Sequence, residues 1–263
     1  MPVWAIANQK GGVGKTTTTL LLGRLLAGRG QRVLLVDLDP HASLTRAFGI
    51  PAEPPPVGTL ELFDQPPKRV VDLARNTPIA GLRLLPAQAG MATLERRSAT
   101  APGLGLALDQ GLAATATDYD AVLLDCPPTL GLLMVNALAA ADQLIIPTQT
   151  EPLALHGMES MLRTAQMIER SRRRPLPVRI LPTLFDRRTR ACVDTLAVLH
   201  ERHPERTWVQ AVPLDTRLRD AALLAATELP TEVLQGRGVD AYRRALAWLL
   251  RESPQPAPME PAG

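Results

Sequence analysis

Residues 3–17 read VWAIANQKGGVGKTT, and this segment gives the clearest indication of the fold. Its apolar start, residues 3–7, predicts a buried strand, and residues 17–26 predict the helix that follows the glycines. Lys10 and Lys15 enclose those glycines and are two of only three lysines in the chain. Glycines here let backbone N–H groups turn inward around phosphates at the positive end of a helix, and an ammonium adds a compact charge. The stretch therefore predicts a nucleoside triphosphate site in an α/β protein.

The loop departs at one place from the usual phosphate-loop pattern G-x-x-x-x-G-K-[ST]. Gln9 stands where a glycine is expected, and a second lysine follows it. A chance glycine turn is the alternative, but the strand and helix on either side favour a phosphate site. The Thr16 hydroxyl is also a candidate ligand of Mg²⁺. We predict that eight consecutive residues bind the nucleotide: Lys10, Gly11, Gly12, Val13, Gly14, Lys15, Thr16 and Thr17.

Two further apolar runs deliver carboxylates to the same region. Residues 33–36 lead into Asp37 and Asp39, and residues 121–124 lead into Asp125. Because open α/β sheets bind ligands outside the carboxyl ends of their strands, these acids are expected beside the phosphates. A carboxylate there can hold Mg²⁺ through water or orient the attacking water. Helix capping by either of the first two acids is the alternative.

Seven apolar runs alternate with helical patterns, which predicts a doubly wound, mostly parallel sheet with helices on both faces. The runs are residues 3–7, 33–36, 82–85, 121–124, 144–147, 178–184 and 208–212. A chain of 263 residues with 46% apolar content can bury the core of one such domain, which we place at residues 1–252. The proline-rich residues 253–263 predict a disordered tail.

Several classes of protein are not supported by the composition. Cys126 and Cys192 are the only cysteines and form no CxxC pair, so neither a disulfide framework nor a zinc site is expected. The first strand begins almost at once, and no apolar stretch reaches the length of a membrane span. We therefore expect a cytoplasmic protein with no stable membrane insertion.

Positive charge is concentrated in one part of the chain. Residues 163–219 contain thirteen arginines against six acidic residues, a net charge of +7, whereas the whole chain has +3. Such a region suits the phosphate backbone of nucleic acid, and the scarcity of aromatic residues favours duplex over single-stranded DNA. A solvated surface in an arginine-biased protein is the alternative.

Residues 8–17 resemble the deviant phosphate-loop (Walker A) ATPases of the ParA and MinD family, in which the first lysine defines the group. The resemblance implies the P-loop NTPase fold, ATP and Mg²⁺ as ligands, and a homodimer that forms on ATP binding. It implies that Lys10 reaches the partner's phosphates, that Lys15 serves its own subunit, and that Asp39 positions the attacking water. The implied catalytic residues are thus Lys10, Lys15 and Asp39, and the implied Mg²⁺ site comprises Thr16, Asp39 and Asp125, the last as the Walker B acid.

The resemblance extends into the basic region. Residues 186–189 and 212–217 match segments that carry nonspecific DNA contacts in ParA-type proteins. The implied DNA-binding residues are Arg188 and Arg217, together with the nearby Arg219. Pro213 matches a family position near adenine, and Leu214 stands where many relatives have arginine.

The residues after Asp39 and Pro40 depart from the partition ATPases, which usually have glutamine, glycine and asparagine where this chain has His41, Ala42 and Ser43. Together with the ending at residues 237–244, this is similar to the ParA-like proteins that place chemotaxis arrays at cell poles, called ParC in some bacteria. No second histidine lies within ligand spacing of His41, so a loop or cap role is favoured over metal binding.

The resemblance implies a slow, partner-stimulated, Mg²⁺-dependent ATPase whose ATP-bound dimer binds nonspecific double-stranded DNA and an adaptor or ParB-like protein. Such a protein positions or partitions chromosomes, plasmids or chemotaxis arrays in the cytoplasm, at the nucleoid or at a pole. One alternative is a MinD-like regulator that cycles on membranes through the amphipathic helix predicted at residues 240–251. Another is a metabolic ATPase of the same fold. A docked last helix is favoured over a membrane-bound one, because a glycine turn precedes it and a proline-rich tail follows it.

Overall fold

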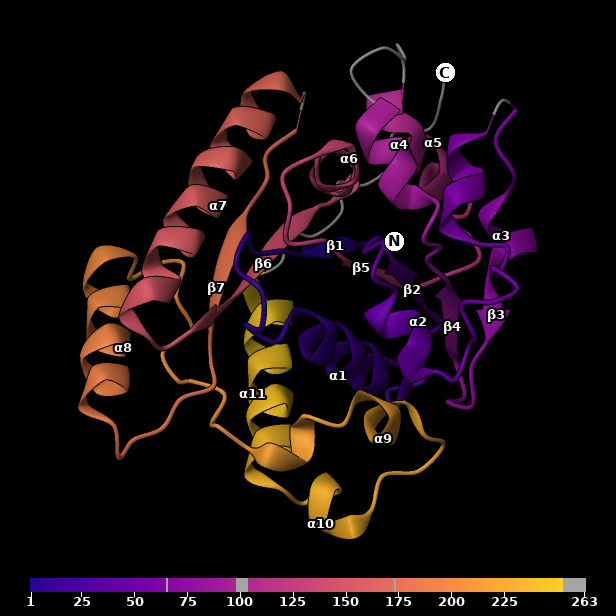
Figure 1. Cartoon of the computed structure of the whole chain (residues 1–263). Helices are drawn as coiled ribbons and strands as arrows, with labels where there is room; N and C mark the ends of the chain where they lie inside the picture. The colour runs from indigo at the N-terminus through magenta and orange to yellow at the C-terminus, as the bar shows by residue number, and fades with distance from the viewer. Residues whose placement is uncertain (65, 98–103, 173, 253–263) are drawn as a thin grey trace, which may run out of the picture.

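One sheet of seven strands forms the centre of the molecule, and helices cover both of its faces (Figure 1). The structure is a computed structural model that describes residues 1–64, 66–97, 104–172 and 174–252. The strand order is β3-β4-β2-β5-β1-β6-β7. This confirms the predicted doubly wound, mostly parallel sheet, whereas the tail predicted at residues 253–263 lies outside the described residues.

All neighbouring strands run parallel except β3 and β4, which pair antiparallel at one edge. The strands are β1 Val3–Ile6, β2 Val33–Asp37, β3 Arg75–Asn76, β4 Leu82–Leu85, β5 Ala121–Asp125, β6 Gln143–Gln149 and β7 Val178–Thr183. The first strand lies between β5 and β6, so the order of the chain across the sheet reverses there. Doubly wound sheets bind ligands at the carboxyl end of such a switch point.

The prediction of a strand at residues 208–212 is wrong, because this segment is not one of the seven strands of the sheet. Its first N–H donates to the carbonyl of Ile180 at 3.0 Å and its last to that of Pro182 at 2.9 Å. Between these two hydrogen bonds the segment advances by four residues while β7 advances by only two. The intervening residues therefore bulge outward, and Val209 is 76% exposed. Pro182 also lacks the N–H that a continuous ladder needs.

The helices divide between the two faces of the sheet (Figure 1). The α-helices are α1 Lys15–Ala27, α2 Ser43–Ala47, α3 Val70–Leu73, α4 Met91–Arg97, α5 Ala107–Ala113, α6 Leu132–Ala140, α7 Pro152–Ser171, α8 Arg190–Arg202, α9 Ala221–Ala225, α10 Thr231–Leu234 and α11 Arg237–Glu252. Short 3-10 helices lie at Thr59–Phe63, Leu104–Leu106 and Thr216–Leu218.

Each face of the sheet has its own hydrophobic core. Val3 and Ala5 of β1 belong to the cluster under α5, α6 and α7, whereas Trp4 and Ile6 belong to the cluster under α1 and α11. All four residues are buried because a central parallel strand is covered on both sides, which explains why these strands read as continuous apolar runs rather than as alternating ones.

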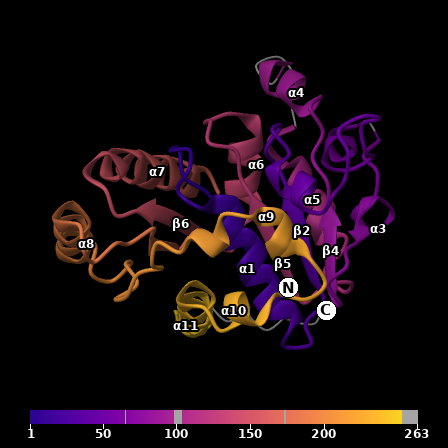
Figure 2. The same ribbon diagram turned by 60° about the horizontal axis from the view of Figure 1, so that its bottom comes forward.

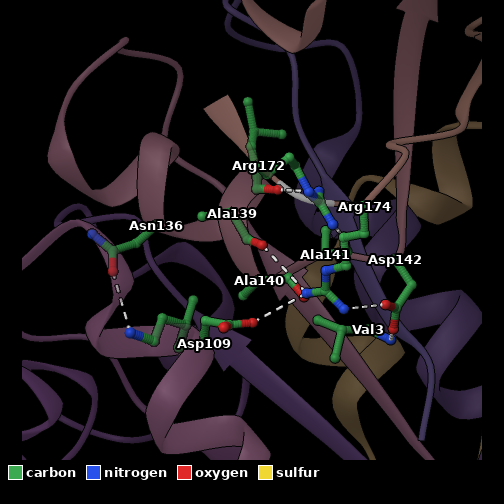
Figure 3. Close-up of polar contacts among 11 residues, drawn as sticks. Val3, Asp109, Asn136, Ala139, Ala140, Ala141, Asp142, Arg172 and Arg174 are labelled. Carbon is green, nitrogen blue, oxygen red and sulfur yellow. Dashed lines mark hydrogen bonds and ion pairs between the residues drawn. The ribbon is translucent and has the colours of Figure 1, made fainter. Parts of the chain in front are cut away.

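Two arginines after α7 close the C-terminal end of α6 (Figure 3). Arg172 donates to the carbonyls of Leu138 and Ala141, both at 2.6 Å. Arg174 pairs with Asp142 at 2.6 Å. Guanidinium groups in this place satisfy carbonyls that have no partner within the helix and compensate the negative end of its dipole. The contacts tie the end of α7 to α6 and to the start of β6.

The last helix, α11, is docked on the globular fold beside α1 (Figure 2), as the sequence favoured. Four residues of its predicted apolar face are at most 2% exposed: Tyr242, Ala245, Leu246 and Leu249. The Tyr242 hydroxyl lies 2.8 Å from Oγ1 of Thr18 in α1. Within the described residues, no helix is both long and apolar enough to span a bilayer.

Candidate functional site

The glycine loop joins β1 to α1 at the switch point of the sheet. Gly12 and Gly14 have φ angles of +74° and +92°, which L side chains rarely adopt. A Cβ built on either glycine, or on Gly11, would find no atom within 4 Å, so the space beside these three residues is open. Gly14 is the N-cap residue of α1, and no side chain makes a capping hydrogen bond there. The start of the helix is therefore not covered by a capping side chain. This cradle fits a phosphate group.

Lys15 lies inside the loop and is only 8% exposed. Its Nζ donates to the carbonyl of Lys10 at 3.1 Å. Burial lowers the pKa of Lys15, while the negative charges of Asp125 and Asp39 oppose that effect. An ammonium has three donors, so Lys15 can hold this carbonyl and still bind phosphate oxygens.

Asp125, at the end of β5, meets the first turns of α1. Its Oδ2 accepts a hydrogen bond from Thr16 Oγ1 at 2.8 Å, and its Oδ1 accepts one from Thr19 at 3.3 Å. Asp37 lies opposite Asp125 in the sheet, and burial raises the pKa of both carboxyl groups. A cation bound between the loop and the sheet edge would stabilise the charged forms of these two buried carboxyl groups.

Asp39 is held in a tight turn after β2. Its N–H donates to Asp37 Oδ1 at 3.1 Å, and its own Oδ1 accepts the N–H of His41 at 2.9 Å. The His41 ring nitrogen Nδ1 lies 2.8 Å from the same oxygen. Ala42 follows with a φ of +55°, a strained backbone conformation for alanine. The turn fixes the direction of the Asp39 carboxylate, and His41 has the loop role expected for it.

The oxygen donors around the loop fit Mg²⁺. No group of three or more histidine, cysteine or acidic side chains that could hold a metal occurs within the part of the chain that the structure describes. Mg²⁺ does not need such a cage, because it usually binds one or two carboxylates, retains several waters and shares substrate phosphates. Thr16 and Asp125, in contact, supply a hydroxyl and a carboxylate for this arrangement, and Asp39 adds a second acid.

Lys10 lies at the rim of the loop rather than inside it. Its Nζ is 3.3 Å from Oε1 of Gln149 and 3.8 Å from Oε2 of Glu151, and its side chain is 29% exposed. The two lysines of the loop therefore have different surroundings: Lys10 is partly exposed, whereas Lys15 is buried.

A cavity of 730 Å³ opens beside the loop. Its walls include Gly12, Gly14 and Thr17 from the loop region, Pro213 from the segment before the last 3-10 helix, and Tyr242 from α11. Pro213 is thus on the same cavity as the loop, where the sequence predicted an adenine contact. Tyr242 was predicted on the apolar face of the last helix, but no sequence signal placed it on this cavity.

The three arginines predicted to bind DNA differ in their surroundings. Arg188 pairs with Asp186 at 2.8 Å and is largely exposed. Arg217 pairs with Asp215 at 2.7 Å and also donates to the carbonyl of Glu232 at 2.7 Å. The third, Arg219, is exposed and lines the cavity beside the loop. Two of the three guanidinium groups therefore have acidic partners in their own chain.

Sequence reasoning missed the side chains that hold the loop in place. Thr183, at the end of β7, donates to the carbonyl of Val13 at 2.9 Å. Gln149 contacts Lys10, and Gln9 binds two hydroxyl groups of α7. The departure of Gln9 from the usual loop pattern was the one signal that could have indicated its contacts.

The chain is similar to a known protein family, to curated proteins and to solved structures. The family profile described as an AAA domain matches residues 1–178. The chromosome-partitioning ATPase Soj of Thermus thermophilus is 37% identical over 244 residues, covering 91% of this chain and 92% of that protein. The sporulation initiation inhibitor protein Soj of Bacillus subtilis is 34% identical, covering 82% and 86%. The crystal structure of cobyrinic acid a,c-diamide synthase from Mycobacterium smegmatis with bound ADP and magnesium has a TM-score of 0.82 at 34% identity, covering 95% of this chain and 94% of that one.

Proposed function

This chain belongs to the ParA/MinD family of P-loop ATPases, and from that premise we propose that it is a partition-type ATPase that dimerises on binding ATP. Its ligands are ATP and Mg²⁺, the pair represented in its solved relatives by ADP or an ATP analogue with magnesium. Hydrolysis to ADP and phosphate, slow until a partner stimulates it, returns the dimer to monomers. Residues 1–252 act as one ATPase domain.

The 2.8 Å hydrogen bond between Thr16 and Asp125 is the observation that carries the proposal. It joins the end of the phosphate loop to the end of β5, where a P-loop ATPase holds its metal. Mg²⁺, when bound, neutralises charge on the phosphate oxygens. Lys15 binds the phosphates of its own subunit, and Asp39, fixed in its turn, orients the attacking water.

Dimerisation is supported by the position of Lys10. Its ammonium lies at the rim, beside Gln149 and Glu151, and is partly exposed. From there it can meet phosphates on a second subunit, as the family resemblance implies. Leu153, two residues after Glu151 at the start of α7, is 75% exposed. It offers apolar surface that a partner subunit can cover.

Nonspecific DNA binding in the ATP state is supported by the basic region and by exposed arginines such as Arg188 and Arg219. An adaptor or ParB-like protein is the proposed stimulating partner. The cargo is a chromosome or plasmid, in keeping with the relatives named for partitioning, and the departures after Asp39 favour chemotaxis arrays as the other candidate. The proposed location is the cytoplasm, at the nucleoid or at a cell pole.

The two other functions considered have less support. Membrane cycling through the last helix would need its apolar face, which is buried against α1. A metabolic ATPase is suggested by the synthase name of a solved relative, whereas several curated relatives are named for chromosome partitioning.

DNA binding across a salt series tests the proposal. Binding of nonspecific duplex DNA is measured with ATP, ADP or no nucleotide, and Asp39→Ala holds the ATP state. We expect binding with ATP alone, weakening steeply as salt rises. Sedimentation of the same samples should show a dimer only with ATP. A monomer that binds no DNA in any nucleotide state would refute the partition function, and turnover with cobyrinic acid and an amide donor would favour the synthase.

A further inference from the structure

The three residues before the glycines, 8–10, pack on one face of α7. Gly157, Ser160 and Thr164 lie three and four residues apart along that helix, so they share this face. A Cβ on Gly157 would be 3.1 Å from Cβ of Lys10 and 3.2 Å from Oδ1 of Asn8, closer than ordinary van der Waals contact. The absence of a side chain at Gly157 therefore lets the segment approach the helix.

Gln9 binds this face of α7 with both ends of its amide. Its Oε1 accepts a hydrogen bond from Ser160 Oγ at 2.8 Å, and its Nε2 donates to Thr164 Oγ1 at 3.0 Å. Thr164 is only 4% exposed. Both polar ends of Gln9 are satisfied by one helix, so the residue immediately before Lys10 has a single favoured orientation.

Asn8 fixes the backbone on the other side. It is fully buried, its Nδ2 donates to the carbonyl of Pro147 at 2.8 Å, and its Oδ1 accepts the N–H of Lys10 at 3.0 Å. The backbone of Lys10 is thus held through Asn8 to β6 and through Gln9 to α7. Its side chain leaves this anchored backbone, is 29% exposed, and brings the ammonium beside Gln149 and Glu151.

We propose that Gln9 is a positioning residue: by docking on Ser160 and Thr164 it holds Lys10 at the rim, aimed out of its own loop toward the phosphates of a partner subunit. A glycine at this place, as in the usual phosphate loop, would make neither contact. The inference rests on the proposed ATP-dependent dimer. It predicts that losing these contacts weakens dimerisation while ATP binding through Lys15 persists.

Matched substitutions test the contact from both sides. Gln9→Met keeps the length of the side chain and removes both hydrogen bonds. Thr164→Val keeps the shape of the partner and removes one, whereas Thr164→Ser retains the hydroxyl. Ser171→Ala, near the end of the same helix, is the control, because its hydroxyl contacts only a carbonyl one turn away. Each is made in the full chain carrying Asp39→Ala.

Three quantities are measured for each variant: ATP affinity by calorimetry, the dimer dissociation constant with ATP by sedimentation, and Tm without nucleotide. We expect Gln9→Met to weaken the dimer by about tenfold or more, with Thr164→Val weaker in effect and ATP affinity within about threefold of the parent. Thr164→Ser and Ser171→Ala should match the parent.

Unchanged dimerisation of Gln9→Met would overturn the inference. So would a parallel loss of ATP affinity and Tm, because that pattern indicates a merely structural contact. If the parent itself stays monomeric with ATP, the proposed function fails, and the inference fails with it. The two failures are distinguished because the first leaves the parent dimer intact.

Discussion

The ammonium of Lys15 and the carbonyl of Lys10 are hydrogen-bonded at 3.1 Å across the glycine loop. Lys15 is buried, whereas the side chain of Lys10 is 29% exposed and lies beside Gln149 and Glu151. The contact keeps the loop closed around the side chain of Lys15 while leaving two of its donors for phosphate. The two lysines of the loop therefore have different environments within one subunit.

Lys15→Ala should weaken ATP binding by about a hundredfold or more, because hydrogen bonds to charged groups contribute about 1.5–3 kcal/mol each. Lys15→Arg should not restore it, since a planar guanidinium does not replace a compact ammonium inside the loop. Calorimetry with ATP and Mg²⁺ measures both. Lys68→Ala, at the only other lysine and on the surface, should bind ATP as the parent does. Parental affinity in Lys15→Ala would contradict the loop assignment.

Asp39→Ala should retain ATP but lose turnover by about a hundredfold or more, because the carboxylate proposed to orient the attacking water is removed. The ATP-bound dimer should accumulate as a result. Phosphate release and sedimentation follow the two effects. Asp64→Ala, an exposed acid outside the site, is the control. Wild-type turnover in Asp39→Ala would exclude the proposed role.

Tyr242→Phe should destabilise the fold by about 1–3 kcal/mol, since it leaves the buried Thr18 hydroxyl without its partner from α11. Burial also raises the pKa of Tyr242 to about 12. A raised folded-state pKa contributes stability that is complete below the unfolded value near pH 10 and is lost as pH rises toward 12.

The difference in unfolding free energy between the parent and Tyr242→Phe, measured by urea titration, should therefore shrink between pH 10 and 12. Tyr119→Phe, at the only other tyrosine, is the comparison for loss of the hydrogen bond below pH 9, because its hydroxyl accepts one long hydrogen bond from Arg83 at 3.3 Å. Burial also raises the pKa of Tyr119, so its difference should change with pH in the same direction. A difference independent of pH in that range would argue against a buried neutral hydroxyl at position 242.

Arg172→Met should cost about 2 kcal/mol of stability, because the carbonyls of Leu138 and Ala141 lose charged donors at the end of α6 (Figure 3). Thermal unfolding measures the loss. Arg170→Met, exposed in the last turn of α7, should leave Tm nearly unchanged. Equal Tm values for the two variants would show that the hydrogen bonds from Arg172 to α6 contribute nothing to stability.

Arg217→Ala and Arg219→Ala should differ, although both remove one positive charge near the proposed DNA surface. Arg217 also donates to Asp215 and to the carbonyl of Glu232, so its loss should slightly lower Tm as well as DNA affinity. Arg219→Ala should weaken only DNA binding and reduce the salt slope by about one. Arg251→Ala controls for net charge, and an unchanged slope in Arg219→Ala would remove that residue from the DNA contact.

Much of the site was predictable from the sequence because its parts are local. The strand, glycine loop and helix at residues 3–26 are consecutive, and the glycines with positive φ lie where the loop pattern requires them. Asp37 and Asp125 end neighbouring buried apolar runs and lie opposite one another, so the rule that parallel strands bring their carboxyl ends to one edge was enough to place them together.

The tertiary structure alone decided which side chains hold these parts in place. Gln9 meets Thr164 across 155 residues of sequence, and Thr18 meets Tyr242 across 224. Neither contact has a periodic pattern, because the partner of a single polar side chain depends on how the strand order brings distant helices to the loop. The same reason explains the error at residues 208–212, where an apolar run was identified correctly but its register against β7 was not. The local pattern of residues was therefore sufficient for the glycine loop and the class of fold, whereas the orientation of Lys10 and of the first turns of α1 depends on how α7 and α11 pack.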